Sequence, residues 1–100
     1  MPVAVELTEQ MAVPTATNVV VGAVSTLLAA ANPLRRYALI VNRSDERVDV
    51  KIGTAAVAGE GIPIPANYWA YEMLPGANLS TAAIYGICSS GAKTVTVVEG

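Results

Sequence analysis

The strongest constraint on the fold is a short run in which apolar and charged side chains alternate. Across residues 47–52, Val48, Val50 and Ile52 fall on one face of an extended chain, and the charged side chains fall on the other. Side chains alternate with a period of two in a β-strand, whereas a helical stripe repeats every 3.6 residues. The segment therefore predicts a strand with one buried face and one solvated face.

The same pattern predicts strands along most of the chain. Residues 93–98 alternate β-branched valines with threonines, and residues 36–41 are apolar enough to be covered on both faces. Further strands are expected at 17–22, 68–73 and 82–88, and turn-forming clusters lie at 42–45, 59–61, 75–78 and 89–91. Only residues 24–31 resemble a helix. The pattern predicts an all-β fold, a small antiparallel β-sandwich or barrel of about seven or eight short strands.

Two prolines in the segment 62–65 indicate its position within a sheet. Pro63 and Pro65 are two residues apart, so both missing N–H groups lie on the same side of an extended chain. Such a strand fits only at the edge of a sheet, with that side turned away from its partner. We therefore expect an edge strand here.

The first sixteen residues differ from the rest of the chain. They show no sustained period, and the simplest expectation is a frayed terminus. They nevertheless carry apolar side chains that suit an extended arm laid on a neighbouring subunit by strand addition. These are Val3, Val5, Leu7, Met11 and Val13. The predicted organisation is an arm at 1–16 followed by one β-sandwich domain at 17–100.

The residue inventory argues against most chemistry. In 100 residues there is no histidine and a single cysteine, Cys88, so we expect no enzyme, no metal site and no cofactor. Six basic residues against eight acidic ones are too few for a nucleic-acid partner. The longest apolar run, 19–31, is shorter than the roughly 20 residues of a membrane span. The acidic segment before it does not fit a signal peptide, so a soluble protein is expected.

Composition also bears on assembly. Hydrophobic residues make up 53% of the chain, more than a domain of this size can bury. Exposed apolar patches usually contact other chains, so we expect a homo-oligomer. Alternatively, the many small alanines inflate the hydrophobic count.

Five of the six basic residues lie between positions 35 and 51. The adjacent pair Arg35 and Arg36 could meet an acidic partner surface, or the charges could be ordinary strand and turn residues. The interleaved carboxylates Asp45, Glu46 and Asp49 predict a solvated face. Cys88 is expected to be an inert buried thiol.

Aromatic side chains gather in one place. Tyr68, Trp69 and Tyr71 are three of the five aromatic residues, and the chain has no phenylalanine. We expect this cluster to supply much of the bulky core. In the predicted strand, Trp69 and Tyr71 share one face and Tyr68 lies on the other, so one set remains for an interface. For Tyr68, core and interface are equally compatible with the pattern.

The order of the turns and strands from Asn32 onward resembles a known group of proteins. The resemblance rests on Asn32-Pro33-Leu34-Arg35, Leu39-Ile40-Val41-Asn42-Arg43-Ser44, Gly61-Ile62-Pro63-Ile64-Pro65-Ala66, Tyr71-Glu72, Ala83-Ile84-Tyr85-Gly86-Ile87-Cys88-Ser89-Ser90-Gly91 and the closing Val95-x-Val97-x-Glu99. This order is similar to that of small β-sandwich virion proteins of tailed bacteriophages. It covers about two-thirds of the chain and leaves residues 1–31 outside.

The resemblance implies a capsid decoration, or cement, protein on the virion surface, made in the host cytoplasm. Its partner would be the major capsid protein, and it would often be a trimer. The interface residues expected are those of the arm together with Arg35, Arg36, Tyr68 and Trp69. The alternative is a tail- or fibre-associated accessory protein that binds a host surface component.

Overall fold

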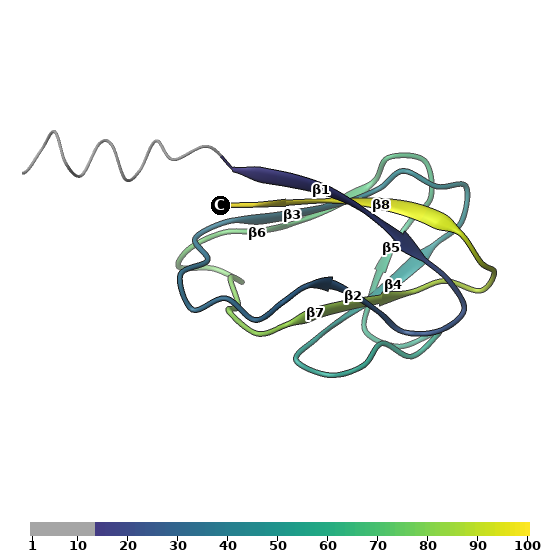
Figure 1. Ribbon diagram of the computed structural model, residues 1–100, viewed down its shortest axis with the longest axis horizontal. Coiled ribbons are helices and arrows are strands. Elements are labelled where there is room, and N and C mark those ends of the chain that lie inside the picture. The colour runs from purple at the N-terminus through teal and green to yellow at the C-terminus, as the bar shows by residue number, and fades with distance from the viewer. Residues whose placement is uncertain (1–13) are drawn as a thin grey trace, which may run out of the picture.

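The computed structural model describes residues 14–100, and this part of the chain is built from strands (Figure 1). They are β1 (Thr15–Val21), β2 (Thr26–Ala29), β3 (Ala38–Asn42), β4 (Val48–Ile52), β5 (Ile62–Ile64), β6 (Ala70–Met73), β7 (Ile84–Ile87) and β8 (Lys93–Glu99). The prediction of an all-β sandwich is confirmed. Within residues 14–100, no helix has the length and apolar character needed to cross a membrane.

The strands pair as a hairpin rolled up on itself. β1 pairs with β8, β2 with β7, β3 with β6 and β4 with β5, all antiparallel. Successive pairs fall in opposite sheets, which gives sheet A the order β1-β8-β3-β6 and sheet B the order β2-β7-β4-β5. Figure 1 shows the two sheets as two layers. Eight strands in these two sheets form a jelly roll.

The core between the sheets is aliphatic. Alternate residues of each strand point inward, and the largest fully buried side chains are Ile40, Ile64, Met73, Ile84, Val21, Val48, Val50, Val95 and Asn42. The expected alternation in β4 is confirmed, because Val48 and Val50 are both fully buried. Burial of each such aliphatic side chain contributes about 1.5–3 kcal/mol.

The expectation that the aromatic cluster supplies much of the core is wrong for Trp69, and Tyr68, which was compatible with either core or interface, also lies outside the core. The predicted strand at 68–73 begins only at Ala70, and the two rings before it are 67% and 63% exposed. Tyr71 does pack against the core, next to Met73 on the same face. The core has enough volume without these rings because branched aliphatic residues from both sheets fill it.

Two further expectations meet different outcomes. Residues 24–31 contain β2 instead of a helix. This segment pairs with β7, and Leu28 and Ala29 are buried, so contacts with a distant strand decide its structure and not the spacing of its own apolar residues. The expected edge strand is confirmed as β5, which among the strands of residues 14–100 pairs with β4 alone and carries Pro63 at its centre. Tertiary pairing overrides a weak helical pattern, whereas a proline within a strand removes a backbone donor and so favours the edge of a sheet.

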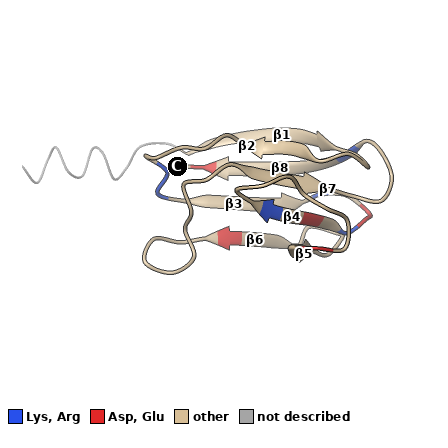
Figure 2. Ribbon diagram, turned by 90° about the horizontal axis from the view of Figure 1, so that it is seen from below, with Lys and Arg blue, Asp and Glu red and all other residues tan. Residues whose placement is uncertain are grey.

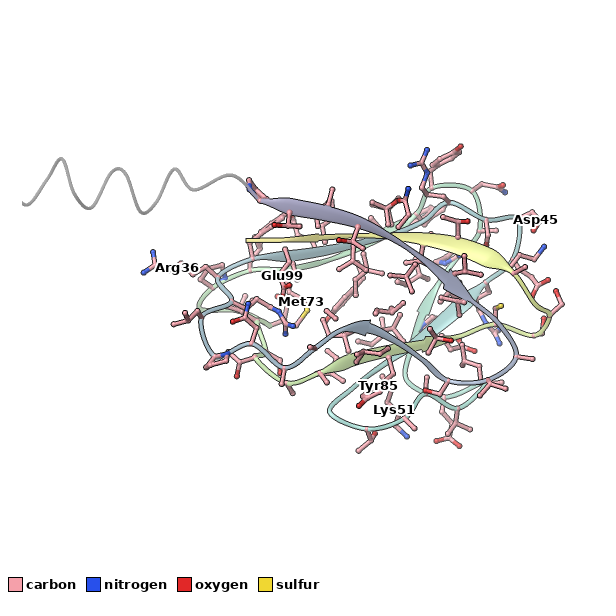
Figure 3. The ribbon with its side chains drawn as sticks, in the orientation of Figure 1. Arg36, Asp45, Lys51, Met73, Tyr85 and Glu99 are labelled. Atoms are coloured by element: carbon pink, nitrogen blue, oxygen red, sulfur yellow. The ribbon has the colours of Figure 1, made fainter. Side chains whose placement is uncertain are left out.

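A loop at residues 53–61 folds back over the outer face of sheet B. The backbone N–H of Gly59 donates to the Asp49 carboxylate at 2.8 Å, and the N–H of Ala56 donates to Ser25 Oγ at 2.8 Å. Asp49 is consequently only 4% exposed, so the expected solvated face of β4 is wrong at this residue. Lys51 and Tyr85 remain on that outer face and project away from the sandwich (Figure 3).

The outer face of sheet A is open and almost free of charge. Figure 2 shows β1 and β3 without a charged residue, and the acidic residue of β6, Glu72, lies at the sheet edge. The strand register places Val20, Leu39, Val41 and Val98 on this face, between threonine and alanine side chains. Val20 is 63% exposed.

Candidate interaction site

A backbone turn at one end of the sandwich presents two aromatic rings to solvent. It joins β5 to β6, and its central residues Asn67 and Tyr68 have φ values of 68° and 69°. Two successive positive φ angles are those of a type I′ turn. Asparagine adopts this region readily, but a bulky tyrosine there costs about 1–2 kcal/mol. The strain has to be balanced by contacts that hold the turn.

Three backbone hydrogen bonds hold it. The N–H of Asn67 donates to the Ser44 carbonyl at 2.8 Å, and the N–H of Tyr68 donates to the Asn42 carbonyl at 2.7 Å. The N–H of Asn42 donates to the Trp69 carbonyl at 2.8 Å. The turn is therefore anchored on the end of β3 and continues the β3–β6 pairing.

Beneath the turn, the side chain of Asn42 ties the two sheets together. It is fully buried, and its Nδ2 donates to the carbonyls of Glu46, Ile64 and Pro65 at 2.7, 3.0 and 3.2 Å. Its Oδ1 accepts from the N–H and the hydroxyl of Ser44. A buried amide with this many partners fixes local geometry, because each lost partner would leave a desolvated polar group.

In the sequence, Asn42 is interpreted as the first residue of the turn cluster at 42–45. Asn42 lies two residues after Ile40, so both side chains fall on the inward face of β3. A polar residue at an inward position was the available signal.

Above this base, three side chains form a surface that we call the aromatic patch: Arg43, Tyr68 and Trp69. The guanidinium carbon of Arg43 lies 5.9 Å from the centroid of the Tyr68 ring, within range of a cation–π contact. Trp, Tyr and Arg are the residue types that most often dominate binding energy at protein interfaces. A backbone that is already fixed beneath exposed rings favours binding, because the turn loses little conformational freedom when a partner covers the rings.

The two adjacent arginines lie in opposite environments. Arg35 is 3% exposed, and its guanidinium donates to Glu99 at 2.6 Å and to the carbonyls of Ser80, Ala82 and Ala30 at 2.7–2.9 Å. The Arg35 guanidinium therefore bonds within the chain, and the buried side chain does not form part of the surface that a partner could contact. Arg36 is exposed and points away from the sandwich, whereas Glu99 points between the sheets (Figure 3).

The other charges form local pairs. Arg47 contacts Asp49, and Lys51 contacts Glu60 at 3.3 Å. The Lys51–Glu60 pair is solvent-accessible, and pairs of this kind contribute little to binding or stability. They leave Arg43 and Arg36 as the exposed arginines among residues 14–100 that have no carboxylate within ion-pair distance.

Glu46 acts as a cap for the turn at 89–91. Its carboxylate accepts from the hydroxyl groups of Ser90 and Ser89 and from both backbone N–H groups. The Ser90 hydroxyl, followed by the Ser89 hydroxyl and the Ser90 N–H, lowers the pKa of Glu46 to about 2. Lys93 likewise lowers the pKa of Asp45 through a 2.7 Å hydrogen bond.

No grouping suited to metal binding occurs among the described residues, and Cys88 is buried just after β7. Burial raises the pKa of its thiol, as an inert cysteine requires. The predicted arm residues Val3, Val5, Leu7, Met11 and Val13 lie outside the described residues.

The structure thus brings two of the predicted interface residues, Tyr68 and Trp69, together with Arg43. Figure 3 labels Arg36 at one end of the sandwich and Asp45 at the other. The aromatic patch lies towards the Asp45 end, because its turn is bonded to Asn42 and Ser44. Comparison with protein-family models, with curated proteins and with solved structures found no match to this chain.

Proposed function

We propose that this chain is a structural protein of a virion, a decoration protein that binds a capsid lattice and stabilises the shell as a homo-oligomer. It carries out no reaction. Its attachment to the major capsid protein is made by the aromatic patch. The observation that carries the proposal is the exposure of Tyr68 and Trp69 on a strained turn that is anchored on the end of β3.

The patch has the properties that a docking surface needs. Its rings are more than 60% exposed, and the turn that presents them is fixed by backbone hydrogen bonds and by the buried amide of Asn42. Strain of this kind persists where surrounding structure enforces it, and it concentrates at functional positions. Placed many times on a symmetric shell, even a modest contact gives high avidity.

The fold supports the same function by analogy. Jelly rolls recur in viral capsid domains, although a fold alone does not determine function. A protein that binds only the assembled shell stabilises the shell by mass action. The resemblance of the turn and strand order to phage virion proteins favours this role over other binding roles.

A second candidate function is adhesion to a host surface component by a tail- or fibre-associated protein. The specific observation in its favour is the same pair of exposed rings beside the amide of Asn67, since lectins also use the jelly roll. The two functions differ in where the protein acts: the shell or the host.

The test uses purified shells that lack the protein. We expect the wild-type chain to bind them and to raise the temperature at which they open. A variant with Tyr68→Ala and Trp69→Ala should bind about 30-fold more weakly, the effect of losing a hot spot worth about 2 kcal/mol. Binding is measured by co-sedimentation, and shell opening by electron microscopy after heating.

Leu34→Ala is the matched control, because Leu34 is 83% exposed and adjoins the buried Arg35, away from the patch. It should bind like the wild type. Circular dichroism checks that each variant is folded. Shells that open at the same temperature with and without the protein would contradict the proposal, and loss of host attachment from intact shells would support adhesion.

A further inference from the structure

Three of the four sheet edges in this sandwich are protected against pairing. β5 has three residues with Pro63 at its centre, and β2 has four residues with a register shift between Leu27 and Ala29. β6 has four residues and carries the charge of Glu72. Short length, proline, bulges and charge are the means by which natural sheets block edge-to-edge association.

The fourth edge, β1, has none of these protections. It has seven residues, Thr15–Val21, with an unbroken register to β8, and it contains no charge and no proline. Thr15, Ala16, Thr17 and Asn18 are all exposed. A long, uncharged edge strand offers its outward backbone N–H and carbonyl groups to another strand.

We propose that β1 pairs antiparallel with β1 of a second copy of this chain about a two-fold axis at Asn18. This pairing would join two copies of sheet A into one continuous eight-stranded sheet. The proposal rests on the edge itself and does not depend on the proposed function.

The sequence of β1 is complementary to itself in this register. With Asn18 opposite Asn18, Ala16 lies opposite Val20, Thr17 opposite Val19 and Thr15 opposite Val21. The β-branched residues in these pairs suit a pleated sheet surface, and no like charges meet. The charge-free edge matters because two copies of an acidic chain, each with a net charge of −2, otherwise repel one another.

The amide of Asn18 is suited to the axis. Its Oδ1 accepts a hydrogen bond from Thr96 Oγ1 at 2.6 Å. Among residues 14–100, its Nδ2 donates to no other group, so it is free to reach the partner across the axis. A contact at a two-fold axis is made twice by the same residues, as an isologous interface requires.

The aromatic patch stays exposed in this pair. It lies beside β6 and the end of β3, and β8 and β3 separate β6 from β1 in sheet A. The two patches would therefore point outward from a pair and could engage two sites at once.

The test measures self-association of the full chain by analytical ultracentrifugation. We expect the wild type to form a dimer. Asn18→Lys places two ammonium groups opposite each other at the axis and should weaken the dimer about ten-fold or more. Thr54→Lys adds the same charge in the exposed loop at 53–61 and should leave the dimer unchanged.

Mixing two charge variants identifies the occupant of the edge. Asn18→Lys and Asn18→Glu should each be monomeric alone, and together they should restore a mixed dimer, because position 18 meets itself across the axis. Restoration also shows that both variants are folded. A monomeric wild type, a trimer, a dimer that survives Asn18→Lys, or a mixture that stays monomeric would each overturn the proposal, the last pointing to another strand on this edge.

Discussion

At the scale of single residues, Arg35 shows how one buried cation holds three chain segments together. Its guanidinium joins the carboxylate of Glu99 in β8 to the carbonyls of Ala30, Ser80 and Ala82. An arginine suits this position because its planar group donates in several directions at once. Removing it would leave buried acceptors without partners.

We expect Arg35→Ala to lower the free energy of unfolding by about 3 kcal/mol, the range for breaking a buried ion pair. Arg36→Ala is the matched control and should change it by less than about 0.5 kcal/mol, because Arg36 is exposed. Urea unfolding followed by circular dichroism gives both values. Equal losses in the two variants would contradict the assigned role of Arg35.

The sequence does not show that Arg35 is buried and Arg36 exposed, nor that Tyr71 packs on the core while Tyr68 and Trp69 face solvent. Arg35 and Arg36 precede β3 in an irregular segment, where no period says which side chain turns inward. Aromatic residues favour strands, so the sequence predicts a strand at Tyr68 and Trp69, but the positive φ angles of Asn67 and Tyr68 form a turn there instead. The prediction that both could serve an interface stays a prediction.

At the scale of elements, the β4–β5 pair depends on one glycine. Gly61 precedes β5 with φ of 86°, and a Cβ added there would lie 2.4 Å from the carbonyl oxygen of Val50. A real side chain cannot approach a backbone atom so closely. The loop at 53–61 can therefore return to the sheet only through a residue without a side chain.

We expect Gly61→Ala to destabilise the domain by about 1–3 kcal/mol more than Gly76→Ala. Both glycines have positive φ, so both substitutions carry a backbone cost of about 1 kcal/mol. Only Gly61 also faces a backbone clash, since a Cβ at Gly76 would meet nothing within 4 Å. Thermal unfolding of the two variants measures the difference. Equal melting temperatures would show that the chain near β5 shifts without cost.

The elements themselves were largely predictable. Alternation in β4 and the prolines around β5 act within a few residues, so a local pattern is enough to find them. β2 was harder because Leu28 and Ala29 become a strand only when β7 lies beside them. Gly86 in β7 makes room for this contact, since a Cβ there would lie 3.0 Å from Leu28.

At the scale of the whole molecule, the two ends of the sandwich are closed by contacts between distant segments. Turn and strand signals predicted a sandwich, but nothing local shows that β1 lies beside β8 or that β3 and β4 fall in different sheets. The closing contacts lie in loops. At one end Arg35 meets Glu99. At the other end Asp45 pairs with Lys93 at the start of β8, and Glu46 accepts from Ser90 in the turn before it.

These carboxylates make the fold sensitive to acid. The pKa of Glu46 is lowered from 4.5 to about 2 in the folded chain, and that of Asp45 is lowered from 3.8 by Lys93. Between about pH 2 and pH 4.5, Glu46 binds more protons in the unfolded chain than in the folded one, so the free energy of unfolding rises with pH. The contribution of Glu46 is therefore complete above about pH 4.5 and disappears as the pH falls through about 2.

We expect Glu46→Gln to be less stable than the wild type at pH 7 and the two unfolding free energies to converge as the pH falls from 4.5 towards 2. The amide cannot accept four hydrogen bonds as the carboxylate does, whereas a protonated Glu46 loses the same advantage in the wild type. Glu60→Gln is the control, because Glu60 makes only an exposed pair with Lys51, and its curve should stay parallel to that of the wild type. Urea unfolding at several pH values supplies the curves. If the Glu46→Gln curve also ran parallel to the wild type down to pH 2, the carboxylate cap would not be what joins these two loops.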